Sequence, residues 1–176
     1  TVYFSFDREP IPAGFVTIGL SIDGLKGGHS GDDINKGRAN ANKVMARLLH
    51  KVWRNYDARL IDLKGGNLHN AIPRDAEALI AIPTADKERL RVDFNVFAAE
   101  VEDEFHVQET EVVFNLQSDE PIDGIQRMAI APAIAKRVIW SLMAVHNGVL
   151  EMSQDIVGLV ETSSNLASVR TSENEL

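Results

Sequence analysis

The chain has 176 residues, 44% of them hydrophobic and 25% charged, which is enough to bury a core in one globular domain or at most two. The absence of cysteine excludes a disulfide framework and a thiolate metal site, and the net charge of −8 makes nucleic acid and anionic membranes poor partners. We find no signal peptide or transmembrane run and expect a cytoplasmic protein.

The first half of the sequence predicts a strand, a helix, a hairpin and a second helix. Residues 16–22 alternate between apolar and polar side chains, which is typical of a strand with one buried face. A glycine-rich loop follows, and apolar residues at helical spacing then predict a helix over 37–54. Two further strands are predicted over 59–64 and 76–82, and Thr84 is the expected N-cap of the next helix.

The second half shows the same order of elements. Residues 111–116 predict a strand. Apolar residues from 125 to 143 predict a helix, with Pro132 near its start. The two segments 149–152 and 159–169 predict a closing pair of strands.

This repeated order predicts an α+β fold. We expect a mainly antiparallel sheet of about seven or eight strands, with three helices packed on one face. The sheet would consist of duplicated ferredoxin-like strand–helix–hairpin units, pseudo-repeats of about 14–105 and 109–170. Residues 1–6, which precede two prolines, are expected to add an edge strand. Since no linker is evident, residues 1–176 are predicted to form a single domain.

His29 is the main candidate for a functional residue, because four glycines surround it in the loop between the first strand and the first helix. A histidine in such a loop can donate a hydrogen bond to a carbonyl or an oxyanion. The alternative is a surface histidine bonded to its own loop. A metal site with Asp32 and Asp33 is disfavoured, since zinc needs three or four ligands. The two aspartates also argue against a phosphate site.

Other polar residues are weaker candidates. Asn70, in a turn between two strands, offers an amide to a ligand or simply tolerates the turn conformation. Arg38 is able to bind a carboxylate, but a solvated role is favoured. Glu100 and residues 102–104 form an acidic cluster that is expected to be a solvated helix face. With no serine–histidine–acid set and no H-E-x-x-H motif, the chain alone does not look like an enzyme.

Five segments resemble the lid domain of bacterial aminoacylhistidine dipeptidases, the Xaa-His dipeptidases that split carnosine. In the order found in that family they are 24–31, 37–43, 59–66, 70–74 and 159–166. The resemblance spans most of residues 8–170.

The resemblance implies a role within a larger metallopeptidase. In that family a catalytic domain holds two zinc ions, or similar divalent ions, and a glutamate base, and a smaller inserted domain acts as a lid or a dimerisation domain. This chain would be the lid alone, without metal ligands or base. Its implied partners are its own catalytic domain, a dipeptide substrate and a second copy of itself.

The resemblance also implies residue roles. His29 matches the lid histidine that stabilises the oxyanion, and Asn70 matches the asparagine that contacts substrate. The arginine that holds the substrate carboxylate is either Arg170 or one beyond Leu176. A different class of function remains open: a stand-alone module with a ferredoxin-like sheet that binds a small carboxylate or amide ligand, or serves in interaction.

Overall fold

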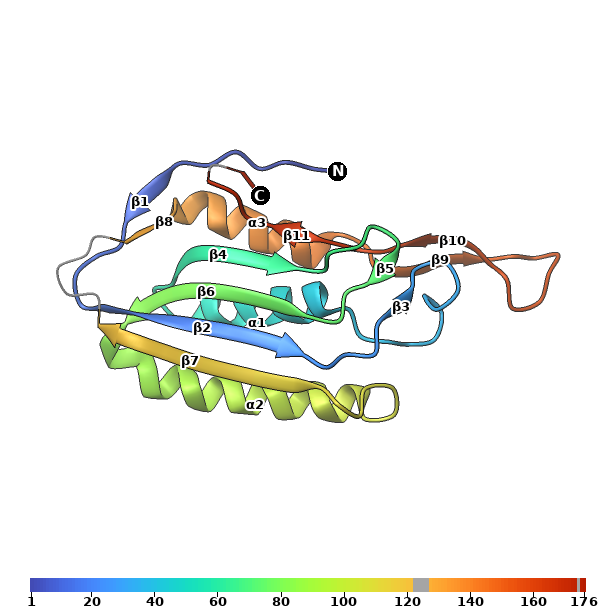
Figure 1. Ribbon diagram of the computed structural model, residues 1–176, viewed down its shortest axis with the longest axis horizontal. Helices are drawn as coiled ribbons and strands as arrows, with labels where there is room; N and C mark the ends of the chain where they lie inside the picture. Colours follow the sequence, from blue (N-terminus) through green and yellow to red (C-terminus); the bar gives the residue numbers. More distant parts are fainter. Residues whose placement is uncertain (122–126, 174) are drawn as a thin grey trace.

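The computed structural model describes residues 1–121, 127–173 and 175–176, and its centre is a five-stranded sheet in the order β11-β4-β6-β2-β7 (Figure 1). Every neighbouring pair in this sheet is antiparallel. The predicted α+β class is confirmed. The strands are β2 (Phe15–Asp23), β4 (Arg59–Gly65), β6 (Ala76–Pro83), β7 (Val113–Pro121) and β11 (Val169–Arg170).

Three helices pack on one face of the sheet, as the sequence predicts: α1 (Ala41–Asn55), α2 (Lys87–Phe105) and α3 (Pro132–Ala144). The alternation along β2 explains this, because Val16, Ile18, Leu20 and Ile22 all point into the core beneath the helices.

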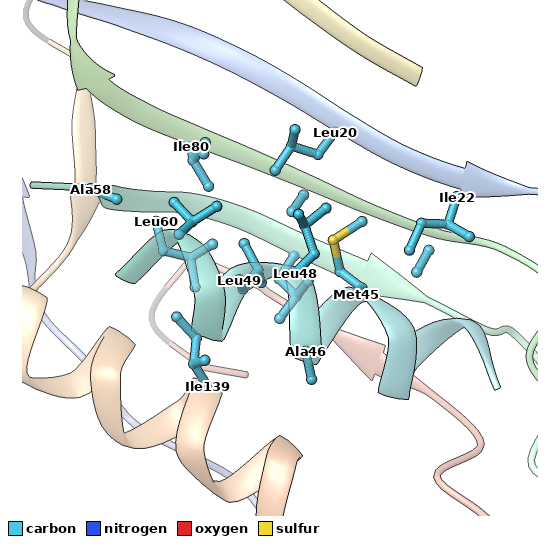
Figure 2. Packing of buried hydrophobic residues seen from close by; sticks show 14 of the residues in the cluster. Leu20, Ile22, Met45, Ala46, Leu48, Leu49, Ala58, Leu60, Ile80 and Ile139 are labelled. Carbon is cyan, nitrogen blue, oxygen red and sulfur yellow. The ribbon is translucent and has the colours of Figure 1, made fainter. Parts of the chain in front are cut away.

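Figure 2 shows the centre of this core, where side chains from α1 meet side chains from the sheet. Leu49 of α1, Leu60 of β4 and Ile80 of β6 are fully buried there. Ile139 brings α3 into the same cluster. The core therefore joins residues from both halves of the sequence.

The first two helices begin later than predicted. Gly37 has a φ of +69°, which no right-handed helix accommodates, so α1 begins only at Ala41. Asn40 caps it by accepting a hydrogen bond from the Lys43 N–H at 3.2 Å. The N-cap prediction for Thr84 is wrong, because its hydroxyl donates to the Gly14 carbonyl at 2.9 Å. It opens a short 3₁₀ turn, η1 (Thr84–Asp86), ahead of α2.

The second half departs further from the prediction. The helix expected from residue 125 begins at Pro132, and the preceding β8 (Met128–Ile130) pairs with β1 (Arg8–Pro10). Residue 125 itself lies outside the described residues.

The main sheet has five strands, fewer than expected, because the closing strands of the chain leave it. β9 (Gly148–Met152) and β10 (Val160–Ser164) form a hairpin of their own, and only β11 reaches the sheet edge. The division into two pseudo-repeats stays a prediction.

The two ends of the described chain pair with each other. Phe4 and Leu176 exchange two backbone hydrogen bonds, at 2.8 and 3.1 Å, and Ser5 bridges to Glu175. The predicted edge strand over residues 1–6 is therefore replaced by contact between the termini. Within the described residues, no helix combines the length and apolar character needed to cross a membrane.

Candidate functional site

A short two-stranded ribbon at one end of the sheet brings His29 and Asn70 together (Figure 1). β3 (Gly28–His29) pairs antiparallel with β5 (Ala71–Ile72), and His29 lies opposite Ala71. The next residue along, Ser30, donates its N–H to the Asn70 carbonyl at 2.9 Å. Both His29 and Asn70 are exposed, so their side chains are accessible to a ligand.

The His29 ring is oriented by its own loop. The Gly31 N–H donates to Nδ1 of His29 at 3.1 Å. A neutral imidazole whose Nδ1 accepts a hydrogen bond carries its proton on Nε2, a tautomer assigned from this contact. The side chain is about half exposed, at 54%. Asp32 Oδ2 lies 3.5 Å from the same Nδ1, so both loop contacts are made at this nitrogen and Nε2 is the ring atom turned away from them.

Asp33 holds the backbone of His29. Its Oδ2 accepts the His29 N–H at 2.8 Å, while Lys36 donates to Oδ1 at 2.6 Å and Arg38 lies 3.1 Å from Oδ2. The hydrogen bond from Lys36, followed by that from His29, lowers the pKa of Asp33 below its usual value. The carboxylate that fixes His29 is thus kept ionised.

Arg38 joins the contacts that Asp33 makes with His29 and Lys36, and we call this group of four residues the clamp. This role differs from the solvated role that the sequence favours. Its guanidinium donates to the Gly27 carbonyl as well as pairing with Asp33. Gly28 has a φ of +141°, and a Cβ there would come within 2.1 Å of Arg38 Nη1 and 2.4 Å of Asp33 Oδ2. Only glycine at position 28 lets the ion pair lie against the ribbon.

Glu109 ties both ends of the loop to the end of α2. It is 3% exposed, and its two carboxylate oxygens accept the N–H of Lys26 at 2.7 Å and of Ala39 at 2.9 Å. Sequence reasoning missed this residue, since a single acid after a helix carries no recognisable pattern. Glu109 nevertheless determines where the loop with His29 begins and ends.

An asparagine network supports the second strand of the ribbon. Asn165 donates to the Ala71 carbonyl at 2.7 Å, and its own side-chain oxygen accepts from Asn40 at 3.3 Å. Asn40 also donates to Asn147 at 2.8 Å. Asn147 precedes β9 and Asn165 follows β10, so the network joins the ribbon to the base of that hairpin.

Arg170 lies on β11, a different element from the ribbon. It is paired with Lys64 of β4, and directly paired residues point to the same face of a sheet. Lys64 lines an open groove of about 450 Å³ on the sheet, with Glu77 at 2.8 Å from its ammonium group. The structure therefore places Arg170 beside this groove and does not place it on the ribbon with His29.

A metal site does not fit this arrangement. Among residues 1–121, 127–173 and 175–176, no group of three or more histidines, aspartates, glutamates or cysteines converges as metal ligands. Asp33, the nearest acid to the His29 backbone, is already engaged by Lys36 and Arg38. The chemistry that this site offers is hydrogen-bond donation.

Comparison with known proteins identifies the fold that carries this ribbon. The sequence pattern of the family described as the peptidase dimerisation domain matches residues 20–109, from β2 to the buried glutamate. The chain belongs to this family. The matched segment includes His29, Asn70 and Glu109, and Arg170 lies outside it.

Two relatives match almost the whole of this chain. The cytosol non-specific dipeptidase of Escherichia coli (strain K12) is 38% identical over 170 residues, which are 97% of this chain and 34% of the relative. The crystal structure of aminoacylhistidine dipeptidase from Vibrio alginolyticus matches with a TM-score of 0.92 and 40% identity, over 98% of this chain and 34% of that one. The resemblance found in the sequence is confirmed, and the chain spans about a third of the length of either relative.

Proposed function

We propose that this dimerisation domain is the substrate-covering lid of a zinc-dependent dipeptidase that cleaves Xaa-His dipeptides such as carnosine. In this role His29 donates a hydrogen bond to the oxyanion that forms on the scissile carbonyl. The two relatives with dipeptidase names support the reaction class, and one of them is named for aminoacylhistidine substrates.

The observation that carries the proposal is the fixed orientation of the His29 imidazole. The Gly31 N–H occupies Nδ1, and Asp33 holds the His29 backbone. Donors that are oriented before the reaction stabilise a developing negative charge without reorganising, and losing one typically costs roughly 10²–10³ in rate. A histidine with its Nε2–H presented in this way is suited to that task.

Asn70 and Arg170 take secondary roles in the proposal. Asn70 is exposed beside His29, where its amide is available to the bound dipeptide in the ground state as well as the transition state. Arg170 is the candidate for the substrate carboxylate. Its place on β11 requires the dipeptide to reach toward the sheet edge, so an arginine elsewhere in the parent is the competing candidate.

The proposal assigns the remaining parts of the enzyme to the rest of a longer protein. The two zinc ions and the general base are assigned to the catalytic domain, as the resemblance to aminoacylhistidine dipeptidases implies. The pairing of Phe4 with Leu176 fits a domain that joins its catalytic partner at one place. The family description supports a homodimer, and the name of the Escherichia coli relative supports a cytoplasmic location.

Replacing His29 in the full-length enzyme tests the proposal. We expect His29→Ala to lower kcat and kcat/KM together by roughly 10²–10³, because the lost hydrogen bond forms mainly in the transition state. His106→Ala is the matched control, since that exposed ring bonds the Asp103 carbonyl at 2.7 Å on a different element. Steady-state kinetics on a Xaa-His dipeptide, with zinc content and melting temperature measured in parallel, gives the result.

Two outcomes separate the roles of the ribbon residues. A near-normal kcat for a folded, zinc-loaded His29→Ala enzyme would show that the histidine only shapes its loop. Asn70→Ala is expected to show a larger share of its effect in KM. If the full-length protein binds a small amide or carboxylate but hydrolyses no dipeptide, the binding-module alternative replaces the lid.

A further inference from the structure

The β9–β10 hairpin, residues 148–164 and called the arm below, has an apolar face. Met152 is paired directly with Val160, and Leu150 lies two residues from Met152 on the same strand. Paired residues and residues two apart point to one face of a ribbon, so these three side chains lie together. Leu150 is 58% exposed and Met152 41%.

The turn at the end of the arm carries further exposed apolar side chains. Ile156 and Leu159 are about half exposed, and Val157 is fully exposed. Figure 1 shows the arm reaching beyond the body of the molecule on the side of β3 and β5. A lone two-stranded hairpin is marginally stable in water, and a contiguous exposed apolar surface marks an interaction site. Both arguments indicate that another surface covers the arm.

The arm is joined directly to the ribbon that carries the proposed site. Asn165, just after β10, donates to the Ala71 carbonyl beside Asn70, and Asn147, just before β9, accepts from the buried Asn40. These contacts fix the base of the arm relative to β5. A body that approaches His29 from solvent therefore approaches the arm as well.

We propose that the arm docks through its apolar face onto the substrate-holding part of the same full-length chain. This inference rests on the function proposed above. Each of the two relatives is about three times as long as this chain, since the match covers 34% of either one. Most of the protein that could lie against the arm is therefore outside the described structure.

The charges of the arm define the chemistry of its docking surface. Glu151, Asp155 and Glu161 are its ionisable residues, and residues 148–164 include no lysine or arginine. Two such acidic arms would repel each other, which disfavours an arm-to-arm contact between copies. The complementary surface is an apolar patch bordered by lysine or arginine side chains.

The test uses the full-length protein with Val157→Asp, and Val92→Asp as its matched control. Val157 is fully exposed at the tip, and Val92 is 62% exposed on α2, so neither change disturbs the core. A charge placed within an apolar contact typically weakens it by about tenfold or more. We expect Val157→Asp to speed amide hydrogen exchange across residues 148–164 by about tenfold and to lower kcat/KM on a Xaa-His dipeptide by a similar factor. Val92→Asp leaves both unchanged.

Three results would overturn the proposal. In the first, the turn residues exchange as fast as unprotected amides in the unmodified protein. In the second, the two variants behave alike in hydrogen exchange. In the third, Val157→Asp lowers the molar mass measured by light scattering, which assigns the arm to a second copy. The hydrogen-exchange measurement does not depend on catalysis. If His29→Ala failed to reduce kcat, the proposed function would be rejected. The hydrogen-exchange rates of residues 148–164 would still decide whether the arm is covered.

Discussion

The core beneath the helices and the loop around His29 are held in different ways. In the core, Leu49 and Ile80 are fully buried among other apolar side chains, and their position follows from shape and volume. In the loop, Glu109 and Asp33 hold the backbone through hydrogen bonds to its N–H groups. Dispersion and hydrophobic burial stabilise the fold, whereas a few polar contacts position the site.

This difference means that stability and position should respond to different substitutions. A cavity in the core lowers the free energy of unfolding of the whole domain, because many elements share that core. A lost hydrogen bond in the loop releases a short segment and leaves the sheet in place. The three predictions below test this separation, beginning with the largest effect.

Leu49→Ala should destabilise the domain by about 2–5 kcal/mol, because it leaves a cavity between α1 and the sheet (Figure 2). Urea denaturation gives the free energy of unfolding. Leu68→Ala, at a leucine 56% exposed in the turn before Asn70, is the matched control and should change it by less than about 0.5 kcal/mol. The NMR signals of the His29 loop should stay in place in both variants, and large shifts there for Leu49→Ala would contradict the separation.

Glu109→Gln should cost about 1–3 kcal/mol, less than the cavity, because the amide NH₂ group would face either the Lys26 or the Ala39 N–H and leave it unsatisfied. The loop should also lose its fixed position, seen as broadened His29 NMR signals. Glu111→Gln changes an exposed acid two residues away and should do neither. Unchanged His29 signals in Glu109→Gln would show that the loop does not need its buried carboxylate.

The smallest effect concerns Asp33 and pH. Its pKa is lowered in the folded protein, first by Lys36 and then by the His29 N–H, so its contribution is fully present above the ordinary value of 3.8. That contribution is lost as the pH falls through the lower folded value. The side-chain carboxyl ¹³C shift of Asp33 should therefore titrate with a midpoint below 3.8. Asp33→Asn should remove this signal and Asp32→Asn should preserve it, and a midpoint above 3.8 would contradict the hydrogen bonds that Asp33 accepts from Lys36 and His29.

The regular elements were predictable from the sequence where one face of an element is buried. The alternation over residues 16–22 identified β2, and the spacing of apolar residues identified all three helices. Helix starts were less predictable, because Gly37 and Asn40 define the start of α1 through backbone geometry that composition does not show. The hairpin at β9 and β10 has the alternation of a sheet strand, and the pattern alone could not show that it leaves the sheet.

The candidate site also contains residues that the sequence could predict and a residue that it could not. His29 was identifiable because glycines surround it, and Asn70 because a family motif includes it. The pairing of β3 with β5 brings these two residues together from segments far apart in the sequence. A local sequence pattern cannot predict such a contact. Glu109 was missed because its function is a buried contact with two distant backbone N–H groups.

The hydrogen bonds between Phe4 and Leu176 have a mechanical consequence. They close the backbone into a ring with one seam, and Arg8 reinforces the seam by donating to the carbonyls of Ser172 and Glu173. Pulling the two ends of the described chain apart would therefore have to break these four hydrogen bonds first.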